Sequence, residues 1–466
     1  MKPKAPLFFL LLSSLIFTSI PYFTHPYPLS WDVWYHIRIS EETTHGILLW
    51  DYGSFGPEGR PHTYPPLFHI FMALSFEFVN LFYEFSMMEL ARILPLILNP
   101  LQILSIYFLL KKLFDERIAL LASFLYILVP TEIVRGNLTT PQNLAQILIP
   151  LGFLGFTIEN RRGLLVSILV GGALIMTHGL SAISYHFTLL TFSSFLSLKR
   201  RELFPLKKFM LLLFFSLAIS SPFLYHLSRF GFVSKIPFGY AQKISLYPKR
   251  LGWILILLAF FGIFNLKNLK KKNLLIISML FANFLLTLNH LFGLSLLPYR
   301  FVEFLPLPLS VLGAFTLNIL SKKRYTSYLV ILILLGTFPK AFELQREQIP
   351  QVTEEEFEAI RFLKDNSLEG IIVMSGWFNA PIIASISKRV PVKGAYESGS
   401  FTSFKRTADV DDFYNGKFEI LKKYNANYVY FADFERREYK KNVLDSMDLD
   451  KIYSSPVFIY LNQRGD

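Results

Sequence analysis

Long apolar stretches, separated by short polar connectors, constrain this chain more than any other feature. Most are roughly 17–21 residues long, enough to cross about 30 Å of hydrocarbon as a helix. The stretches lie at about residues 6–24, 90–110, 118–134, 143–159, 163–178, 180–197, 208–227, 251–266, 273–291, 301–320 and 325–339. The pattern predicts a polytopic α-helical membrane protein with about eleven transmembrane helices.

The net charge of +13 agrees with this class, although a basic chain can also indicate nucleic-acid binding. The Lys and Arg residues gather in the connectors between apolar stretches, where a membrane protein retains positive charge on its cytoplasmic side. We therefore expect membrane lipids and no nucleic acid as partners. The chain has no cysteine, which excludes disulfides and thiolate chemistry.

The first apolar stretch, about Pro6–Phe23, follows Met1-Lys2-Pro3-Lys4 and has the outline of a signal peptide. No small-residue cleavage site follows it, so we interpret it as the first membrane anchor. Lys2 and Lys4 then predict a cytoplasmic N-terminus.

A further apolar stretch, 66–83, does not have to cross the membrane. If this stretch crossed the membrane, all the basic connectors would be external; if it did not, all of them would be cytoplasmic. These connectors are Lys111-Lys112 with Arg117, Arg161-Arg162, Lys199–Arg201 with Lys207-Lys208, Lys267–Lys272 and Ser321–Arg324. Only the second arrangement puts them on the same side as the N-terminus. We therefore expect an external or interfacial helix, opened by Pro65-Pro66, and an extracellular C-terminal part.

We divide the chain into a transmembrane domain, 1–340, which includes a long external loop at 25–89, and a more polar domain, 341–466. The polar domain alternates helical and strand patterns, which is typical of a small α/β domain. Its predicted helices are Glu354–Lys364 and Phe413–Tyr424, and its predicted strands are Ile371–Met374, Tyr428–Phe431 and one or two within Ile452–Leu461.

The first external loop begins with Ser30-Trp31-Asp32-Val33-Trp34-Tyr35-His36-Ile37-Arg38, directly after the first anchor. A carboxylate beside the hydrocarbon is unfavourable unless it is paired or used, so Asp32 is the first candidate catalytic residue. If the segment is helical, Asp32 and His36 share a face. The structural alternative is that Asp32 caps a helix.

The rest of this loop offers more polar groups for a sugar or a cation. Together with Trp31, Trp34, His36 and Arg38, the candidate substrate-binding residues are Asp51, Glu58, Arg60 and His62. Ion pairs that hold the loop together are the alternative. A metal site built on His36, His62 and His69 has little support because no close HxxH or HExxH spacing is present.

Arg300 opens the stretch 301–320 and is a candidate for binding a lipid phosphate, since a guanidinium holds a phosphate in a two-pronged manner. Two alternatives stay open. Arg300 extends to water from the membrane interface, or it pairs with Glu303.

These residues resemble the catalytic subunit of archaeal and eukaryotic oligosaccharyltransferases, which are GT-C membrane glycosyltransferases. The resemblance rests on the segment from Trp31 to Arg38, on Trp50-Asp51, on Pro57-Glu58-Gly59-Arg60 and on Tyr64-Pro65-Pro66-Leu67. It continues through Leu121–Pro130, Arg135 and three segments of the polar domain, Val373–Asn379, Ser387–Val392 and Asn427–Val429.

The chain also departs from that family. The family's second acidic motif lies seven residues after an Arg; counted from Arg135, that position holds Gln142, followed by Asn143. The family's Trp-Trp-Asp acceptor motif aligns with Gly376-Trp377-Phe378, which lacks the Asp. These losses put both recognition of an Asn-Xaa-Ser/Thr sequence and a tightly held Mn²⁺ or Mg²⁺ in doubt, because such ions need several carboxylates.

The resemblance implies a GT-C fold and transfer of a sugar from a polyprenyl- or dolichyl-linked donor to a glycan, lipid or protein acceptor on the external face. It implies that Asp32 serves as the base, that Arg300 binds the donor phosphate, and that Arg135, Gln142, Asn143 and Trp377 lie near substrates. No metal ligand and no cofactor are predicted firmly. The alternatives are a diverged oligosaccharyltransferase and a non-catalytic relative that binds lipid-linked glycans.

Overall fold

The computed structural model describes residues 5–230, 244–266, 270–294, 296–321, 336, 339–394, 403–439, 444, 449–454 and 456–462. The chain forms two compact units. The helical unit comprises residues 1–26, 92–223 and 236–349, and the α/β unit comprises residues 27–91, 224–235 and 350–466. The first loop thus groups with the C-terminal residues, and the domain boundary at about residue 340 stays a prediction.

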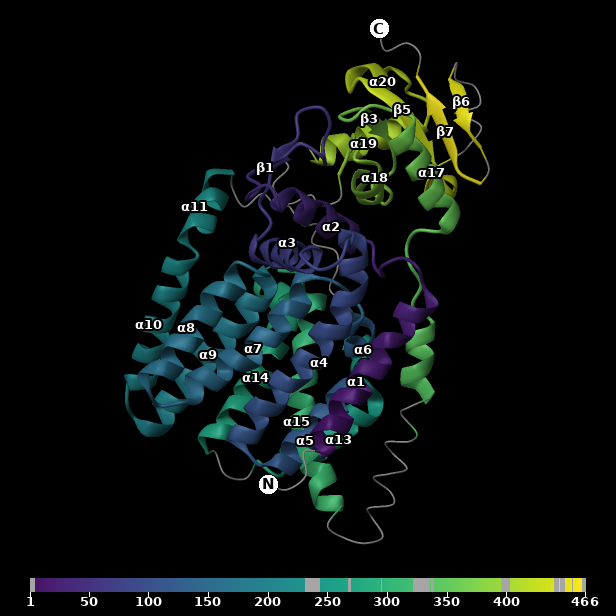
Figure 1. Ribbon diagram of the computed structural model, residues 1–466. Coiled ribbons are helices and arrows are strands. Elements are labelled where there is room, and N and C mark those ends of the chain that lie inside the picture. Colours follow the sequence, from purple (N-terminus) through teal and green to yellow (C-terminus); the bar gives the residue numbers. More distant parts are fainter. Residues whose placement is uncertain are drawn as a thin grey trace. The chain divides into compact units, whose positions relative to one another are not determined.

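The helical unit is a bundle whose members come from almost the whole first two thirds of the chain (Figure 1). Its helices are α1 (Ala5–Thr24), α4 (Met87–Leu113, from Arg92 on), α5 (Glu116–Ile127), α6 (Pro130–Gly136), α7 (Pro141–Thr157), α8 (Arg161–Ile175), α9 (Gly179–Arg200), α10 (Phe204–Ile219), α11 (Ser221–Phe230, which begins in this unit), α12 (Tyr247–Leu251), α13 (Trp253–Ile263), α14 (Lys271–Thr287) and α15 (Pro306–Leu320). Short 3-10 segments lie at η1 (Ile244–Leu246), η2 (Asn289–Phe292) and η3 (Pro298–Phe304).

Local sequence explains where several of these helices begin and how closely they pack. The side chains of Asp115 and Asn160 accept hydrogen bonds from the backbone N–H groups of Ile118 and Gly163, and so cap the first turns of α5 and α8. On α13, a Cβ atom at Gly262 would collide with the backbone carbonyl of Leu312 on α15. Glycine at this position lets the two helices approach closely, as in membrane bundles.

Among the described residues, three helices are long and apolar enough to cross a membrane by themselves: Ala5–Thr24, Met87–Leu113 and the continuous segment Pro298–Leu320. Three bent pairs raise the number to as many as six: α5 with α6, α10 with α11, and the segment Ile244–Leu251 with α13. Helices such as α7 and α14, of 17 residues each, are about 26 Å long at 1.5 Å per residue. The count of eleven stays a prediction, and its last stretch, 325–339, lies almost wholly outside the described residues.

The stretch 66–83 contains α3 (Leu67–Asn80), a helix of 14 residues. At 1.5 Å per residue it is about 21 Å long, short of the roughly 30 Å of hydrocarbon. This length supports the prediction that 66–83 does not cross the membrane.

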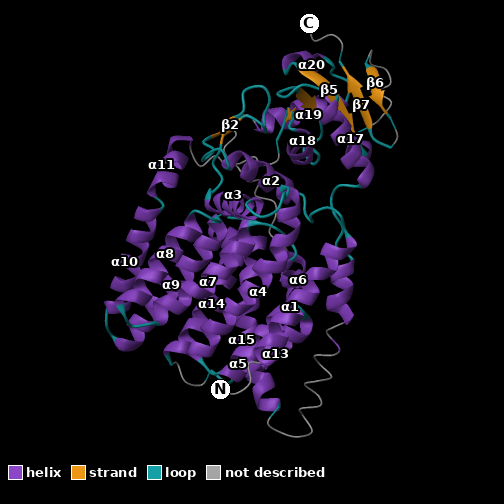
Figure 2. Ribbon diagram, viewed as in Figure 1, coloured by secondary structure: helices purple, strands orange, loops and turns teal. Residues whose placement is uncertain are grey.

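The α/β unit begins with α2 (Asp32–Thr43), followed by the short antiparallel pair β1 (Trp50–Asp51) and β2 (Arg60–Pro61), and then α3. Its C-terminal part contains α17 (Glu354–Asp365), β3 (Ile372–Met374), α18 (Ala380–Ser387), β4 (Val390–Pro391), α19 (Ser403–Tyr414), α20 (Glu419–Lys423), β5 (Ala426–Phe431), α21 (Asp433–Glu438), β6 (Asp450–Tyr453) and β7 (Phe458–Leu461). In the part of the chain that the structure describes, all strands belong to this unit (Figure 2).

Five of these strands form one sheet in the order β4-β3-β5-β7-β6. The pairs β3–β4 and β3–β5 are parallel, and the pairs β5–β7 and β6–β7 are antiparallel. The helix predicted over Phe413–Tyr424 is wrong as one element, because α19 ends at Tyr414 and α20 begins only at Glu419. Gly416, with φ of +108°, makes the turn between them.

Candidate functional site

Asp32 is the first residue of α2, and its carboxylate lies in the first helical turn. It is not the N-cap, because Trp31 occupies that position without a side-chain capping bond. Asp32 is partly exposed, and its backbone N–H donates to the hydroxyl of Ser30 over 3.3 Å. The positive end of a helix dipole favours a carboxylate at this place.

The other predicted residues of α2 point into the α/β unit. Trp34, His36 and Arg38 are each at most 3% exposed. The helix therefore places Asp32 at its partly exposed start, whereas the candidates that follow it are buried.

The side chain of Asp51, at the end of β1, is fully buried between two arginines. Its Oδ1 lies 2.7 Å from Nη2 of Arg38, and its Oδ2 lies 3.5 Å from Nε of Arg60. Burial alone would raise the pKa of Asp51, but the charges of Arg38 and Arg60 outweigh it and lower this pKa to about 2. Asp51 is thus a permanently charged centre that ties α2 to the β1–β2 pair.

Three of the histidines of the first loop lie together. Nδ1 of His36 is 2.9 Å from Nε2 of His69, and Nδ1 of His62 is 3.2 Å from the hydroxyl of Tyr35. Burial lowers the pKa of His36 and that of His62 to about 3, so both rings are neutral near pH 7. Within the described residues, no group of three or more His, Asp or Glu side chains has a geometry that could hold a metal ion.

Glu58 forms an ion pair with Arg406 of α19, which also donates to the backbone carbonyl of Val392 over 2.7 Å. The first loop is therefore attached to the C-terminal part of the α/β unit by charge. Asp51, Glu58 and Arg60 thus form ion pairs that hold the loop together, which is the alternative to a role in substrate binding.

Trp377 lies in an aromatic group that reaches the helix start bearing Asp32. The rings of Trp31 and Trp377 meet edge to face at 5.5 Å, and the indole N–H of Trp31 donates to the carbonyl of Phe378 over 2.5 Å. Trp377 is 42% exposed, so part of its ring is open to a ligand. The group joins two of the segments that carry the family resemblance.

Glu435 is a carboxylate that the sequence analysis missed. Glu435 is on α21 and is fully buried against the segment that follows β3. Its carboxylate accepts hydrogen bonds from the backbone N–H of Gly376 over 2.9 Å and from the side-chain amide of Asn379 over 2.8 Å. Burial raises its pKa to about 7, against the opposing effect of these donors. Glu435 holds the segment that carries Trp377.

In the helical unit, Arg135, Gln142 and Glu303 form one polar cluster. Arg135 makes an ion pair with Glu303, and its Nη1 donates to Oε1 of Gln142 over 2.7 Å. The amide of Gln142 in turn donates to Oε2 of Glu303 over 2.8 Å. Position 142 holds an amide, but Glu303, which lies far along the chain, supplies a carboxylate to the cluster.

Arg300 lies at the edge of this cluster, on η3. Its Nη2 is 3.4 Å from Oε1 of Gln142, and its Nε is 3.9 Å from Oε2 of Glu303. The side chain is 27% exposed, whereas that of Glu303 is 4% exposed. Glu303 therefore belongs more closely to Arg135 than to Arg300.

Asn143 does not join this cluster through its amide. Its side chain donates to the backbone carbonyls of Arg135, over 2.8 Å, and Leu138, over 2.5 Å. These bonds hold the turn between α6 and α7, so Asn143 positions the neighbouring Gln142.

A second carboxyl that the sequence analysis missed is Glu132, buried in the helical unit. The hydroxyl of Tyr126 donates to it over 2.6 Å, and Gln102 and Gln146 complete the network. Its members come from α4, α5, α6 and α7, and no local spacing reveals such a group.

An apolar cavity of about 700 Å³ lies in the helical unit. Leu125, Ile133, Leu251 and Trp253 line it, with Lys249 at its wall. Arg250, next to Lys249, donates to the carbonyl of Tyr299 over 3.3 Å, which joins α12 to η3. An apolar hollow next to a basic segment suits a lipid chain that ends in a phosphate.

Comparison with known proteins agrees with this chemistry. The model of the dolichyl-phosphate-mannose-protein mannosyltransferase family matches residues 63–226. A comparison with curated protein sequences gave no match.

Solved structures share the fold over most of the chain. The oligosaccharyltransferase AglB from Archaeoglobus fulgidus, solved with an inhibitory peptide and a dolichol-phosphate, has a TM-score of 0.70 at 14% identity, over 92% of this chain and 70% of AglB. ArnT from Cupriavidus metallidurans, bound to undecaprenyl phosphate, has a TM-score of 0.63 at 12% identity, over 98% of each chain. The mycobacterial arabinofuranosyltransferase AftD has a TM-score of 0.63 at 14% identity, over 99% of this chain and 42% of AftD.

These matches confirm the predicted resemblance and show that the chain has the GT-C fold, and they indicate a multi-pass membrane protein. AglB has also been solved with zinc. In this chain the residues do not fit such an ion: positions 142 and 143 hold amides, and the carboxylate of Glu303 is paired with Arg135.

Proposed function

We propose that this chain, whose fold and family match are those of GT-C glycosyltransferases, moves a sugar or glycan from a polyprenyl- or dolichyl-phosphate donor to an acceptor hydroxyl on the external face. The observation that carries the proposal is the position of Asp32, partly exposed in the first turn of α2. Three other acids of the same loop, Glu42, Asp51 and Glu58, form ion pairs with Arg38 or Arg406.

Asp32 acts as the general base in this proposal. Its carboxylate takes the proton of the acceptor hydroxyl while the acceptor oxygen bonds to the anomeric carbon of the sugar. The bond between that carbon and the donor oxygen breaks, and the lipid phosphate leaves with the electron pair. A positioned carboxylate typically contributes about 10²–10⁴-fold to such a step.

Arg300 stabilises the charge that grows on the leaving phosphate. It suits this role because it is partly exposed and basic, and because η3 is bonded to α12, which lines the apolar cavity. AglB and ArnT, which share the fold, have been solved with dolichol-phosphate and undecaprenyl phosphate. The cavity would hold the isoprenoid chain of the donor.

The acceptor is a lipid-linked glycan, a surface polysaccharide or a Ser/Thr hydroxyl and not an Asn side chain. In the segment Gly376–Asn379, no Asp is present, and the amide of Asn379 is bonded to the buried Glu435. The exposed ring of Trp377 offers a flat apolar surface for a sugar or a peptide side chain instead.

The test is transfer by the purified protein from radiolabelled polyprenyl- and dolichyl-phosphate sugars, with separate glycan, lipid and peptide acceptors. We expect label in a hydroxyl acceptor and little in an Asn-Xaa-Thr peptide. Label in that peptide would identify a diverged oligosaccharyltransferase, and no transfer with any donor would favour a relative that only binds lipid-linked glycans.

The same assay with EDTA tests metal use. Because positions 142 and 143 carry amides, we expect the rate to change less than twofold. Loss of transfer with EDTA, restored by Mn²⁺ or Mg²⁺, would show that the carboxylates of the first loop bind an ion.

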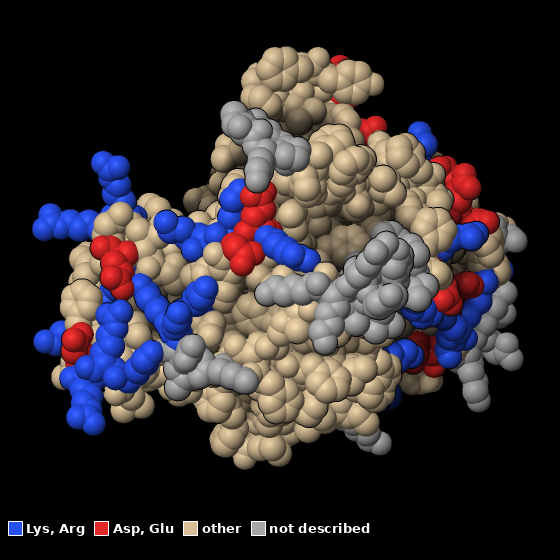
Figure 3. Space-filling view, turned by 90° about the horizontal axis from the view of Figure 1, so that it is seen from below, with Lys and Arg blue, Asp and Glu red and all other residues tan. Residues whose placement is uncertain are grey.

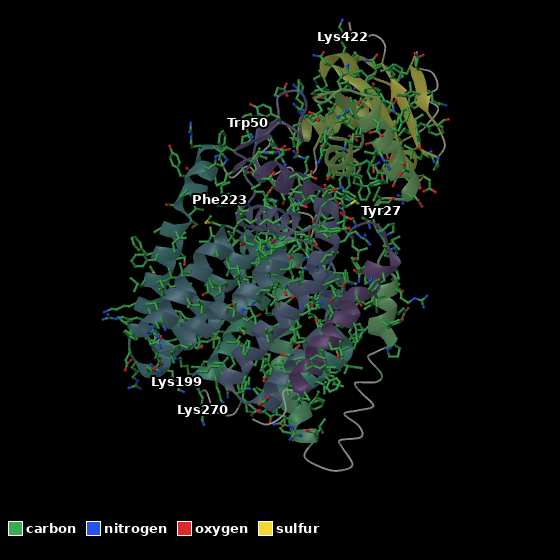
Figure 4. The ribbon with its side chains drawn as sticks, viewed as in Figure 1. Tyr27, Trp50, Lys199, Phe223, Lys270 and Lys422 are labelled. Atoms are coloured by element: carbon green, nitrogen blue, oxygen red, sulfur yellow. The ribbon has the colours of Figure 1, made fainter. Side chains whose placement is uncertain are left out.

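The orientation follows from the basic connectors. Lys199 and Lys270 lie at the same end of the helical unit, and Phe223 lies at the other end (Figure 4). We propose that the end with Lys199 and Lys270 is cytoplasmic, as is the N-terminus, and that the C-terminal residues are extracellular, in a multi-pass protein of the cell membrane. Single cysteines replacing Lys270 and Ser403 should then label from opposite sides of the membrane.

A further inference from the structure

The end of the helical unit that carries the basic connectors contains a second large cavity, of about 620 Å³. It lies between the end of α7, the start of α8, the end of α9 and the starts of α10 and α14. Its walls include Phe156, Leu164, Phe192, Leu196 and Leu211. The function proposed above does not use this cavity.

Basic side chains surround these apolar walls. Those that line the cavity are Arg161, Arg200, Lys207, Lys208 and Lys271. Among the described residues that line it, Glu159 is the single acid. Figure 3, which views the molecule from this end, shows Lys and Arg gathered over the ends of α8, α9 and α10, on the left. The cavity therefore combines apolar walls with an excess of positive charge.

Two of the lysines are held in place by the end of α7. The ammonium of Lys208 donates to the carbonyls of Phe156, over 2.6 Å, and Ile158, over 3.3 Å. That of Lys271 donates to the carbonyl of Thr157 over 2.8 Å and to Glu159 over 2.7 Å. These bonds satisfy carbonyl groups at the negative end of the helix and fix the inner wall of the cavity.

The remaining cations are less engaged. Arg200 lies 3.6 Å from Glu159, which already binds Lys271. In the described part of the chain, no ion pair within 4.0 Å involves Arg161 or Lys207, and both side chains are exposed. Their positive charge is available to a ligand that enters the cavity.

We propose that this cavity binds an anionic glycerophospholipid of the adjacent leaflet. Its phosphate would lie between Arg161 and Lys207, and an acyl chain would run along the wall formed by Leu164 and Leu211. If these charges served only to set the topology, the basic connectors would be sufficient, and no apolar cavity between them would be needed. A soluble anion would match the cations and leave the walls empty, whereas a zwitterionic lipid would leave the excess charge unbalanced. Basic pockets between helices at this depth are suited to lipid headgroups.

The experiment compares two double variants of the full chain in detergent by titration with a fluorescent phosphatidylglycerol. Arg161→Gln with Lys207→Gln removes two charges that line the cavity. Arg162→Gln with Arg201→Gln removes two exposed charges of the same connectors that do not line it. We expect the first variant to bind at least tenfold more weakly than wild type and the second to bind within threefold.

Three further arms decide the ligand class. Leu211→Gln, which changes the apolar wall alone, should also weaken binding, and phosphatidylcholine should compete poorly. Equal losses in both double variants would overturn the proposal, because the connectors would then attract lipid by charge alone. Displacement of the lipid by millimolar inorganic phosphate would also overturn it, because the cavity would then be a site for soluble anions.

Discussion

The start of α2 and the end of β1 each present one carboxylate of the same loop, in opposite surroundings. Asp32 is partly exposed at the end of a helix dipole. Asp51 is buried between Arg38 and Arg60, which hold its pKa at about 2. Asp51 cannot take a proton near pH 7, and it has no access to a substrate.

From this difference we propose a structural role for Asp51 and a chemical role for Asp32. An acid locked by two arginines stabilises the loop and keeps α2 in place. An acid that is exposed at the end of that rigid helix can meet an acceptor in a defined position. The buried network around Asp51 is, in this account, the support that positions Asp32.

The largest expected effect on this comparison comes from Asp51→Asn. This change leaves the buried Arg38 and Arg60 without their partner carboxylate, and it should lower the free energy of unfolding by about 3–5 kcal/mol. Asp32→Asn, the matched control, should change it by less than about 1 kcal/mol, because Asp32 is partly exposed. Thermal unfolding in detergent measures both, and equal losses would remove the distinction between the two acids.

An intermediate effect is expected at Arg300. Arg300→Ala should raise the donor concentration for half-maximal rate by about tenfold or more, as for loss of a hydrogen bond to a charged group. Arg300→Lys should be intermediate, because it keeps the charge and loses the two-pronged geometry. Arg117→Ala, an exposed arginine of another connector, is the control.

The acceptor titration should not move with these variants. If Arg300→Ala behaves like wild type toward donor, Arg300 only extends to water. If Glu303→Gln reproduces the Arg300→Ala defect while Arg135→Lys does not, Arg300 acts through its pair with Glu303 and not on the phosphate.

A smaller effect concerns Glu435, whose pKa is raised by burial to about 7 from an ordinary 4.5. The folded chain binds this proton more tightly than the unfolded chain, so the contribution of Glu435 to stability falls as pH rises from about 4.5 to 7. As pH rises over this range, the unfolding temperature of the wild type should therefore fall relative to that of Glu435→Gln. A difference independent of pH would show that Glu435 is ionised throughout.

The apolar stretches allowed the helices of the helical unit to be located from the sequence, and the resemblance of Trp31–Arg38 pointed to Asp32. The alternating pattern also located α17 and the strands β3, β5, β6 and β7. The helix and strand predictions worked because they depend on local periodicity, whereas the role of Asp32 stays a prediction.

The remaining features depend on contacts between distant residues. Glu303 replaces the carboxylate missing at position 142 by reaching Arg135, and Glu435 supports the segment of Asn379. Nothing in the spacing along the chain indicates either contact. The helix predicted over Phe413–Tyr424 failed because its apolar pattern continues through a turn at Gly416.

The central claim, that Asp32 is the base and Asp51 its support, is tested most directly by the rate of sugar transfer in purified Asp32→Asn. The variant keeps the size of the side chain and removes its charge and basicity. At a protein concentration matched by folded fraction, we predict a rate lower by about 10²–10⁴-fold with an unchanged unfolding temperature. Transfer within a few-fold of the wild-type rate by this folded variant would contradict the account.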